Sequence, residues 1–98
     1  MFDTPANITK YSRVVIDFTA TWCGPCKRIA PFYQKLEEQY KNVVFFKIDV
    51  DKYEDVAKEY KVDSMPTFIT LLNGKIFKTL MGANEQKLEQ LIKELSNE

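Results

Sequence analysis

Two strand-sized apolar runs with one helical pattern between them constrain the fold of this chain more than any other feature. The first covers residues 14–19, which read Val-Val-Ile-Asp-Phe-Thr, and the second covers residues 43–50. Such nearly continuous runs are typical of strands covered on both faces of a sheet. Residues 23–40 between them carry an apolar stripe at helical spacing, formed by Ile29, Phe32, Tyr33, Leu36 and Tyr40. We therefore expect a right-handed β-α-β unit with parallel strands.

The second half of the chain predicts a hairpin followed by a helix. Asn73 and Gly74 separate two apolar segments, residues 67–72 and residues 75–81. Asn-Gly is the strongest two-residue signal for an antiparallel β-hairpin. Asn84 is placed to cap a last helix, whose buried stripe is formed by Leu88, Leu91, Ile92 and Leu95.

Two shorter helices are expected outside these units. Thr4 followed by Pro5 resembles an N-cap with proline at the first helical position, which predicts a helix over residues 5–11. Asp51 and Glu54 indicate a capped helix that runs through Tyr60. The expected order is therefore β-α-β, helix, β-β-α.

The size and charge of the chain limit the classes of function. Its 98 residues suit one domain, and 14 basic residues balance 14 acidic ones. We therefore expect no nucleic-acid or membrane partner, because no strong field holds an anionic surface. No apolar stretch has the length of a membrane span and no leader-like segment is present, so we expect a soluble, cytoplasmic protein. Histidine is absent, which excludes Cys-His nucleophile pairs.

The only two cysteines lie where the first apolar run ends and the first helix begins, in the segment Trp22-Cys23-Gly24-Pro25-Cys26. Two thiols at this spacing can form and reopen a small disulfide, and a helix N-terminus favours the thiolate. We expect Cys23 to face solvent and to be the nucleophile, and Cys26, less exposed, to resolve the mixed disulfide. The alternatives are a structural bridge or half of a zinc site, although zinc needs about four ligands and no other Cys or His exists.

Asp17 interrupts the first apolar run with a carboxyl group. Burial of a carboxylate raises its pKa, so Asp17 is a candidate for proton transfer. The alternative is an ordinary polar residue near the end of a strand.

The order of several separated segments resembles the thioredoxin family over nearly the whole chain. These segments are Asp-Phe-Thr-Ala-Thr-Trp-Cys-Gly-Pro-Cys-Lys (17–27), Lys-Ile-Asp-Val-Asp (47–51), Met-Pro-Thr-Phe (65–68) and Gly-Ala (82–83). Thr19 and the segment Ser-Met-Pro-Thr-Phe (64–68) resemble eukaryotic cytosolic members, including the plant h-type. The resemblance implies an α/β protein with the thioredoxin fold: three α/β/α layers around a mixed sheet of four strands, or five with the family's first strand.

The resemblance also implies roles for residues outside the cysteine motif. Asp17 lies behind Cys26 in the family and is its general base, and Lys47 matches a lysine near that carboxyl group, with a solvated strand residue as the alternative. Pro66 matches a proline that follows a cis peptide bond and faces the cysteines, so that the backbone of Met65 meets an extended substrate.

Four further positions are implied to shape the substrate groove. Trp22 and Gly82 frame it in the family, with a core aromatic and a strand terminator as the alternatives. Gly24 and Pro25, between the cysteines, resemble the members that reduce disulfides.

The function implied is a thiol-disulfide oxidoreductase that reduces disulfide bonds in protein substrates through the redox disulfide Cys23–Cys26. No bound cofactor and no metal are expected, because electrons reach the family from NADPH through a separate flavoprotein, thioredoxin reductase. No Gly-rich dinucleotide fingerprint is present. The alternatives are an oxidase or isomerase module and a non-catalytic binding subunit with this fold.

The N-terminus departs from the family pattern, since too few residues precede Val14 for both the usual first strand and a full first helix. Without that strand, residues 43–46 are expected to form an exposed apolar sheet edge. Such edges favour pairing between chains. We therefore expect a monomer that shows some self-association through this edge, or a reduced stability.

Overall fold

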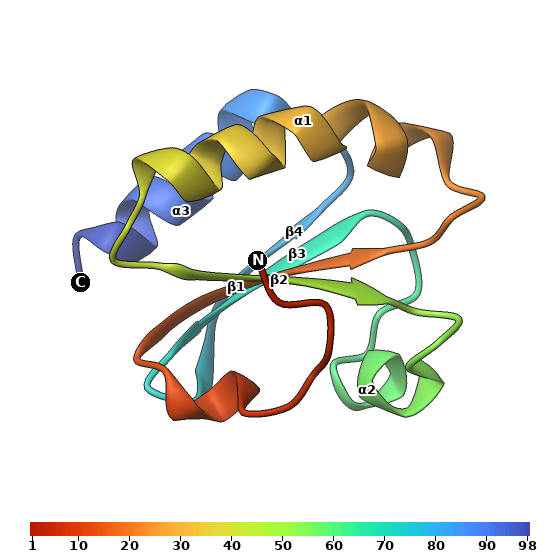
Figure 1. Cartoon of the computed structure of the whole chain (residues 1–98), viewed down its shortest axis with the longest axis horizontal. Helices are drawn as coiled ribbons and strands as arrows, with labels where there is room; N and C mark the ends of the chain where they lie inside the picture. Colours follow the sequence, from red (N-terminus) through yellow and green to blue (C-terminus); the bar gives the residue numbers. More distant parts are fainter.

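The computed structural model describes all residues, 1–98, and has a four-stranded mixed sheet with helices on both faces (Figure 1). The strand order is β2-β1-β3-β4; β1 and β2 are parallel, and the other neighbours are antiparallel. The elements follow a 3-10 helix at Ile8–Lys10 and are β1 (Arg13–Thr19), α1 (Gly24–Gln39), β2 (Val44–Asp49), α2 (Glu54–Glu59), β3 (Thr67–Leu72), β4 (Lys75–Met81) and α3 (Glu85–Ser96). The predicted β-α-β and β-β-α units are confirmed. No helix has both the length and the apolar character that crossing a membrane requires.

The alternation of side chains along β1 divides the core into two layers. Val15 points to the face covered by α1 and α3, where it packs in a cluster with Tyr33 and Leu88. Val14, Ile16 and Phe18 point to the opposite face, which α2 and the 3-10 helix cover. Asp17 shares the alternation of Val15, so the carboxyl group lies on the α1 side of the sheet.

The hairpin follows the prediction. Asn73 and Gly74 have φ values of 52° and 83°, the positive angles that a tight two-residue hairpin turn requires. A β-bulge between Thr70 and Leu71 shifts the register, and the amide of Lys78 donates a hydrogen bond of 3.0 Å to the Thr70 hydroxyl oxygen there. The turn thus brings the end of β4 beside the start of β3, which is part of the site described below.

The two short helices begin differently from the prediction. Only Ile8–Lys10 forms a 3-10 helix in the first segment, after Asn7 in the left-handed conformation, so Thr4 does not cap a helix there. α2 begins at Glu54 without a side-chain cap. The carboxylate of Asp49 instead accepts hydrogen bonds from the amides of Asp51 and Lys52, and this local turn takes the place of the expected cap.

The open edge of β2 is partly covered by the N-terminal segment. Phe2 forms a single parallel bridge to Phe46: its amide donates to the Phe45 carbonyl at 3.0 Å, and its carbonyl accepts from Lys47 at 2.7 Å. The sheet therefore has four strands and one bridging residue rather than five strands. The expected exposure of residues 43–46 is wrong for their side chains, because Val43, Phe45 and Phe46 are buried in the two core layers. Self-association through the backbone edge stays a prediction.

The cap of α3 is a local contact whose contribution can be measured. The side-chain oxygen of Asn84 accepts a hydrogen bond of 2.9 Å from the amide of Lys87, as the sequence predicts. Asn84→Ala should lower the free energy of unfolding by about 1 kcal/mol, because that amide loses its partner. Urea unfolding measures the change, and Asn97→Ala, at the exposed other end of α3, is the matched control. Equal stability of the two variants would contradict the role of Asn84.

Candidate active site

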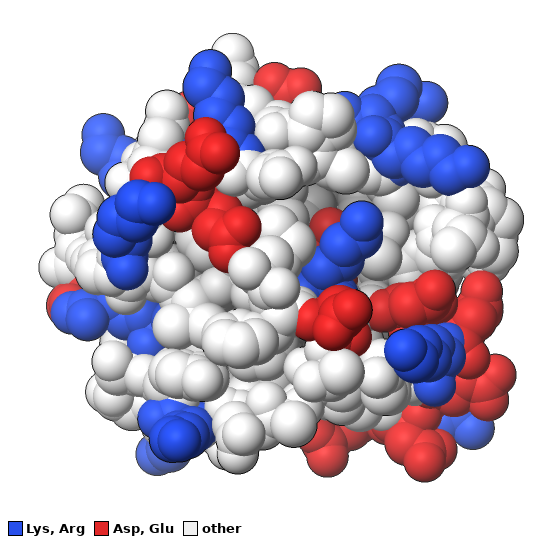
Figure 2. All heavy atoms as spheres, in the orientation of Figure 1, with Lys and Arg blue, Asp and Glu red and all other residues white.

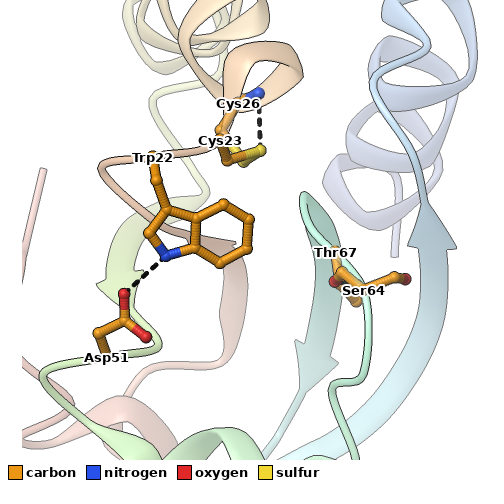
Figure 3. Close-up of a disulfide and its surroundings, with 6 residues drawn as sticks. All are labelled: Trp22, Cys23, Cys26, Asp51, Ser64 and Thr67. Atoms are coloured by element: carbon orange, nitrogen blue, oxygen red, sulfur yellow. Dashed lines mark hydrogen bonds between the residues drawn. A yellow bond between two sulfur atoms is a disulfide. The ribbon is translucent and has the colours of Figure 1, made fainter.

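The two cysteines form a disulfide at the N-terminus of α1, as predicted. Cys23 is the N-cap residue of the helix, and Gly24 and Pro25 form its first turn. The amide of Cys26 donates a hydrogen bond of 3.2 Å to Cys23 Sγ (Figure 3). The Cys23 sulfur therefore lies where a helix offers unpaired amides and the positive end of its dipole, which stabilise a thiolate.

Exposure does not distinguish the two cysteines. Cys23 is 4% exposed and Cys26 is 3% exposed, so the expectation that Cys23 faces solvent is wrong for this oxidised form. Both sulfurs pack in a small cluster with Ala20, against which Met65 and Val50 also pack. The hydrogen bond at the helix end, rather than accessibility, singles out Cys23 as the more stabilised thiolate.

The peptide bond between Met65 and Pro66 is cis, as the family resemblance implied. The carbonyl of Pro66 accepts a hydrogen bond of 2.9 Å from the amide of Gly82, so the loop before β3 is tied to the end of β4. Gly82 has a φ of +100°, which explains why glycine stands there. Met65 packs against the cysteine cluster, so Met65, Pro66 and Gly82 lie together beside the disulfide.

Trp22 is a surface residue of the site rather than a core aromatic, since its side chain is 65% exposed. The indole Nε1 donates a hydrogen bond of 2.8 Å to Asp51 Oδ2, which holds the ring beside the cysteines (Figure 3). Sequence reasoning missed this role of Asp51 and interpreted it as a helix cap. The two residues are 29 positions apart, and no local pattern signals their contact.

Asp17 is a buried acid with a raised pKa, as its place in an apolar strand predicts. It is 1% exposed, and its Oδ1 atom has no hydrogen-bond partner. Burial raises the pKa of Asp17 from 3.8 to about 7, although the positive charge of Lys47 acts in the opposite direction. A carboxyl group with this pKa exchanges a proton readily near neutral pH.

Asp17, Lys47 and Cys26 line two neighbouring cavities. Asp17 and Lys47 are register partners on β1 and β2, and both line a pocket of about 280 Å³. A larger cleft of about 680 Å³ is lined by Cys26 and Lys47. Lys47 and Ala30 belong to the walls of both cavities, so the buried carboxyl group and the second cysteine line adjacent cavities.

The charges on the molecule are mixed rather than concentrated in one sign. Figure 2 shows Lys and Arg spread over the visible face, and Asp and Glu gathered at the lower right, over the end where α2 lies. No three His, Cys, Asp or Glu side chains are grouped so that they could hold a metal ion. The chemistry that this arrangement supports is dithiol-disulfide exchange assisted by an acid.

Comparison with known proteins agrees with the geometry. The thioredoxin family model matches residues 3–94. Thioredoxin of sheep (Ovis aries) is 49% identical over 94 residues, 96% of this chain and 90% of the sheep protein. An H-type thioredoxin of Ricinus communis is 51% identical over 79 residues, 81% of this chain and 67% of that protein.

A solved structure of a thioredoxin from Plasmodium falciparum superposes with a TM-score of 0.87 at 47% sequence identity, covering 89% of this chain and 85% of that chain. These similarities cover nearly the whole chain, and they include the segment that forms the disulfide at the start of α1. The chain therefore belongs to the thioredoxin family, and it is a protein-disulfide oxidoreductase.

Proposed function

We propose that this protein works as a reductase of protein disulfides, with Cys23 as the attacking and Cys26 as the resolving cysteine. The observation that carries the assignment is the hydrogen bond from the Cys26 amide to Cys23 Sγ at the start of α1. In the reduced protein, the Cys23 thiolate attacks one sulfur of the substrate disulfide, and the other sulfur leaves as a thiolate. Cys26 then attacks Cys23, which releases the second substrate thiolate and forms the Cys23–Cys26 disulfide.

Asp17 serves the second step as a base. Cys26 must lose its proton before it attacks, because the thiolate is the nucleophile. A carboxylate with a pKa of about 7 takes that proton near neutral pH, and the cavities that share Lys47 and Ala30 carry it to and from Cys26. Lys47 supports this role by its positive charge, which partly offsets the burial of the carboxylate.

The substrate chain lies in the groove formed by Trp22, Met65, Pro66 and Gly82. An extended peptide pairs with the backbone of Met65, in the manner of an added β-strand. Trp22 offers an exposed apolar ring, and Gly82 presents no side chain. The support for this placement is that Met65 packs on the cysteine cluster, that Pro66 follows Met65 and is hydrogen-bonded to Gly82, and that Trp22 directly precedes Cys23.

The oxidised protein is recycled by a separate flavoprotein, thioredoxin reductase, with electrons from NADPH. This chain supplies the dithiol and binds no cofactor of its own. It acts in the cytoplasm, as one domain of 98 residues.

Insulin disulfide reduction coupled to NADPH and thioredoxin reductase tests the proposal. The wild-type protein should consume NADPH and precipitate insulin, whereas Cys23→Ser should show only the background rate, because it lacks the attacking sulfur. Asp63→Asn, an exposed carboxyl group on the loop before β3, is a control variant that should keep the wild-type rate. Activity that survives in Cys23→Ser would contradict the assignment, and a protein that only oxidises reduced substrates would be an oxidase or isomerase module.

A further inference from the structure

Tyr33 carries a buried phenol group that has no role in the mechanism above. It lies on α1, is 1% exposed, and packs against Phe45 and Phe68. Its hydroxyl group lies 2.7 Å from the carbonyl oxygen of Phe46 and 3.2 Å from that of Val15. Since a carbonyl can only accept, the single hydroxyl hydrogen of Tyr33 is directed to the backbone of β1 and β2.

The hydroxyl oxygen of Tyr33 is therefore left as an acceptor, and it lies in the wall of the pocket that Asp17 lines. Both residues border the pocket of about 280 Å³, together with Lys47 and Glu37. Asp17 Oδ1 is the buried carboxyl atom without a partner. Buried polar atoms of this kind normally form hydrogen bonds to protein or to water.

We propose that Tyr33 is a positioning residue for the proton on Asp17: its hydroxyl oxygen accepts a hydrogen bond from a water in the shared pocket, and that water accepts one from the protonated carboxyl group. The proposal rests on the role of Asp17 in the proposed function. Because the hydroxyl hydrogen of Tyr33 points to the backbone carbonyls, the negative end of the hydroxyl dipole is turned away from them, and next to Asp17 it disfavours the carboxylate and favours the protonated form. The charge of Asp17 also helps to raise the pKa of Tyr33, after the larger effect of burial, which keeps the phenol neutral.

The other titratable groups near Asp17 come from β2, α1 and the N-terminus. Lys47 on β2 faces Asp17 in the sheet register and favours the carboxylate. Glu37 on α1 lines the same pocket and is paired with the Met1 amino group at 2.8 Å. Cys26 on α1 borders the neighbouring cleft. Lys47 and Tyr33 thus act on the titration of Asp17 with opposite signs.

Tyr33→Phe tests this role because it removes the acceptor and retains the ring. The Asp17 carboxyl group is followed by carbon-13 NMR in the oxidised protein without substrate, so the result does not depend on the proposed activity. The midpoint of its titration should fall by about 0.5 to 1 pH unit. Tyr40→Phe, at the C-terminal end of the same helix, should leave the midpoint unchanged. An unchanged or higher midpoint in folded Tyr33→Phe would overturn the proposal.

A second measurement uses the wild-type protein and does not need that variant to fold. With ring-labelled tyrosine, the Cζ shift of Tyr33 should follow pH with the midpoint of Asp17, because its hydroxyl partner gains and loses a proton there. The step should vanish in Asp17→Asn. A Tyr33 signal that is flat through the titration of Asp17 would contradict the hydrogen bond.

Discussion

The Cys26→Ser protein should accumulate a covalent complex with its substrate, and its turnover should fall to the uncatalysed background. Cys23 still attacks the substrate disulfide, but the serine hydroxyl cannot displace it from the mixed disulfide. The complex is measured on a non-reducing gel, and mass spectrometry locates the linkage at Cys23. A dithiol reagent should release the substrate.

Cys23→Ser is the matched control for this trap, because it removes one sulfur from the same disulfide. It should form little complex, because the remaining thiol at Cys26 lies within the first turn of α1. The helix amide that stabilises a thiolate donates to the sulfur at position 23, not to that of Cys26. If Cys23→Ser trapped substrate more strongly than Cys26→Ser, the roles of the two cysteines would have to be exchanged.

Asp17 should make the wild-type protein less stable as pH rises, and Asp17→Asn should remove this dependence. The pKa of Asp17 is about 7 in the folded protein and 3.8 in its ordinary state. Between these values the folded protein binds more protons than the unfolded chain, so the free energy of unfolding falls as pH rises from about 4 to 7 and stays low above that range. The shift corresponds to a loss of roughly 4 kcal/mol at most.

Urea unfolding at a series of pH values from 4 to 9 measures this effect. Above pH 7 Asp17→Asn should be more stable than the wild type by up to a few kcal/mol. The gain is smaller than the full effect of the charge, because burial of the amide also costs free energy. Asp63→Asn, at an exposed acid, should follow the wild-type curve. The same Asp17→Asn protein should resolve mixed disulfides about 100-fold more slowly near and above neutral pH, because Cys26 lacks the proposed base. Wild-type stability that is flat over this range would show that Asp17 is not a buried acid with a raised pKa.

The strands and the larger helices could be predicted because their signals are local. The apolar run at residues 14–19 became β1 (Arg13–Thr19), extended by one residue, and the Asn-Gly pair formed the predicted turn. The raised pKa of Asp17 was also predictable, since an acid in a strand covered on both faces must be buried. Resemblance, rather than local pattern, was needed for the cis bond before Pro66.

The missed features depend on contacts between distant segments. The bond from Trp22 to Asp51 joins the end of one loop to another loop, and the bridge from Phe2 to Phe46 joins the N-terminus to β2. The similar burial of Cys23 and Cys26 arises from packing against Ala20 and Met65 in the closed disulfide. Neither spacing nor hydropathy contains this information, because both describe neighbours along the chain.

The disulfide also lies between two different surfaces, the proposed substrate groove and the cleft at Cys26. Met65 packs on the cysteine cluster and belongs to the proposed substrate groove. The cleft of about 680 Å³ is lined by Cys26, Lys47 and Ala30, and neither Met65 nor Trp22 is in its wall. A substrate bound in the proposed groove would therefore leave the cleft at Cys26 open to water. In the proposed reaction, thiol-disulfide exchange therefore takes place at the groove, while the proton of Cys26 is exchanged with solvent on the side of the cleft.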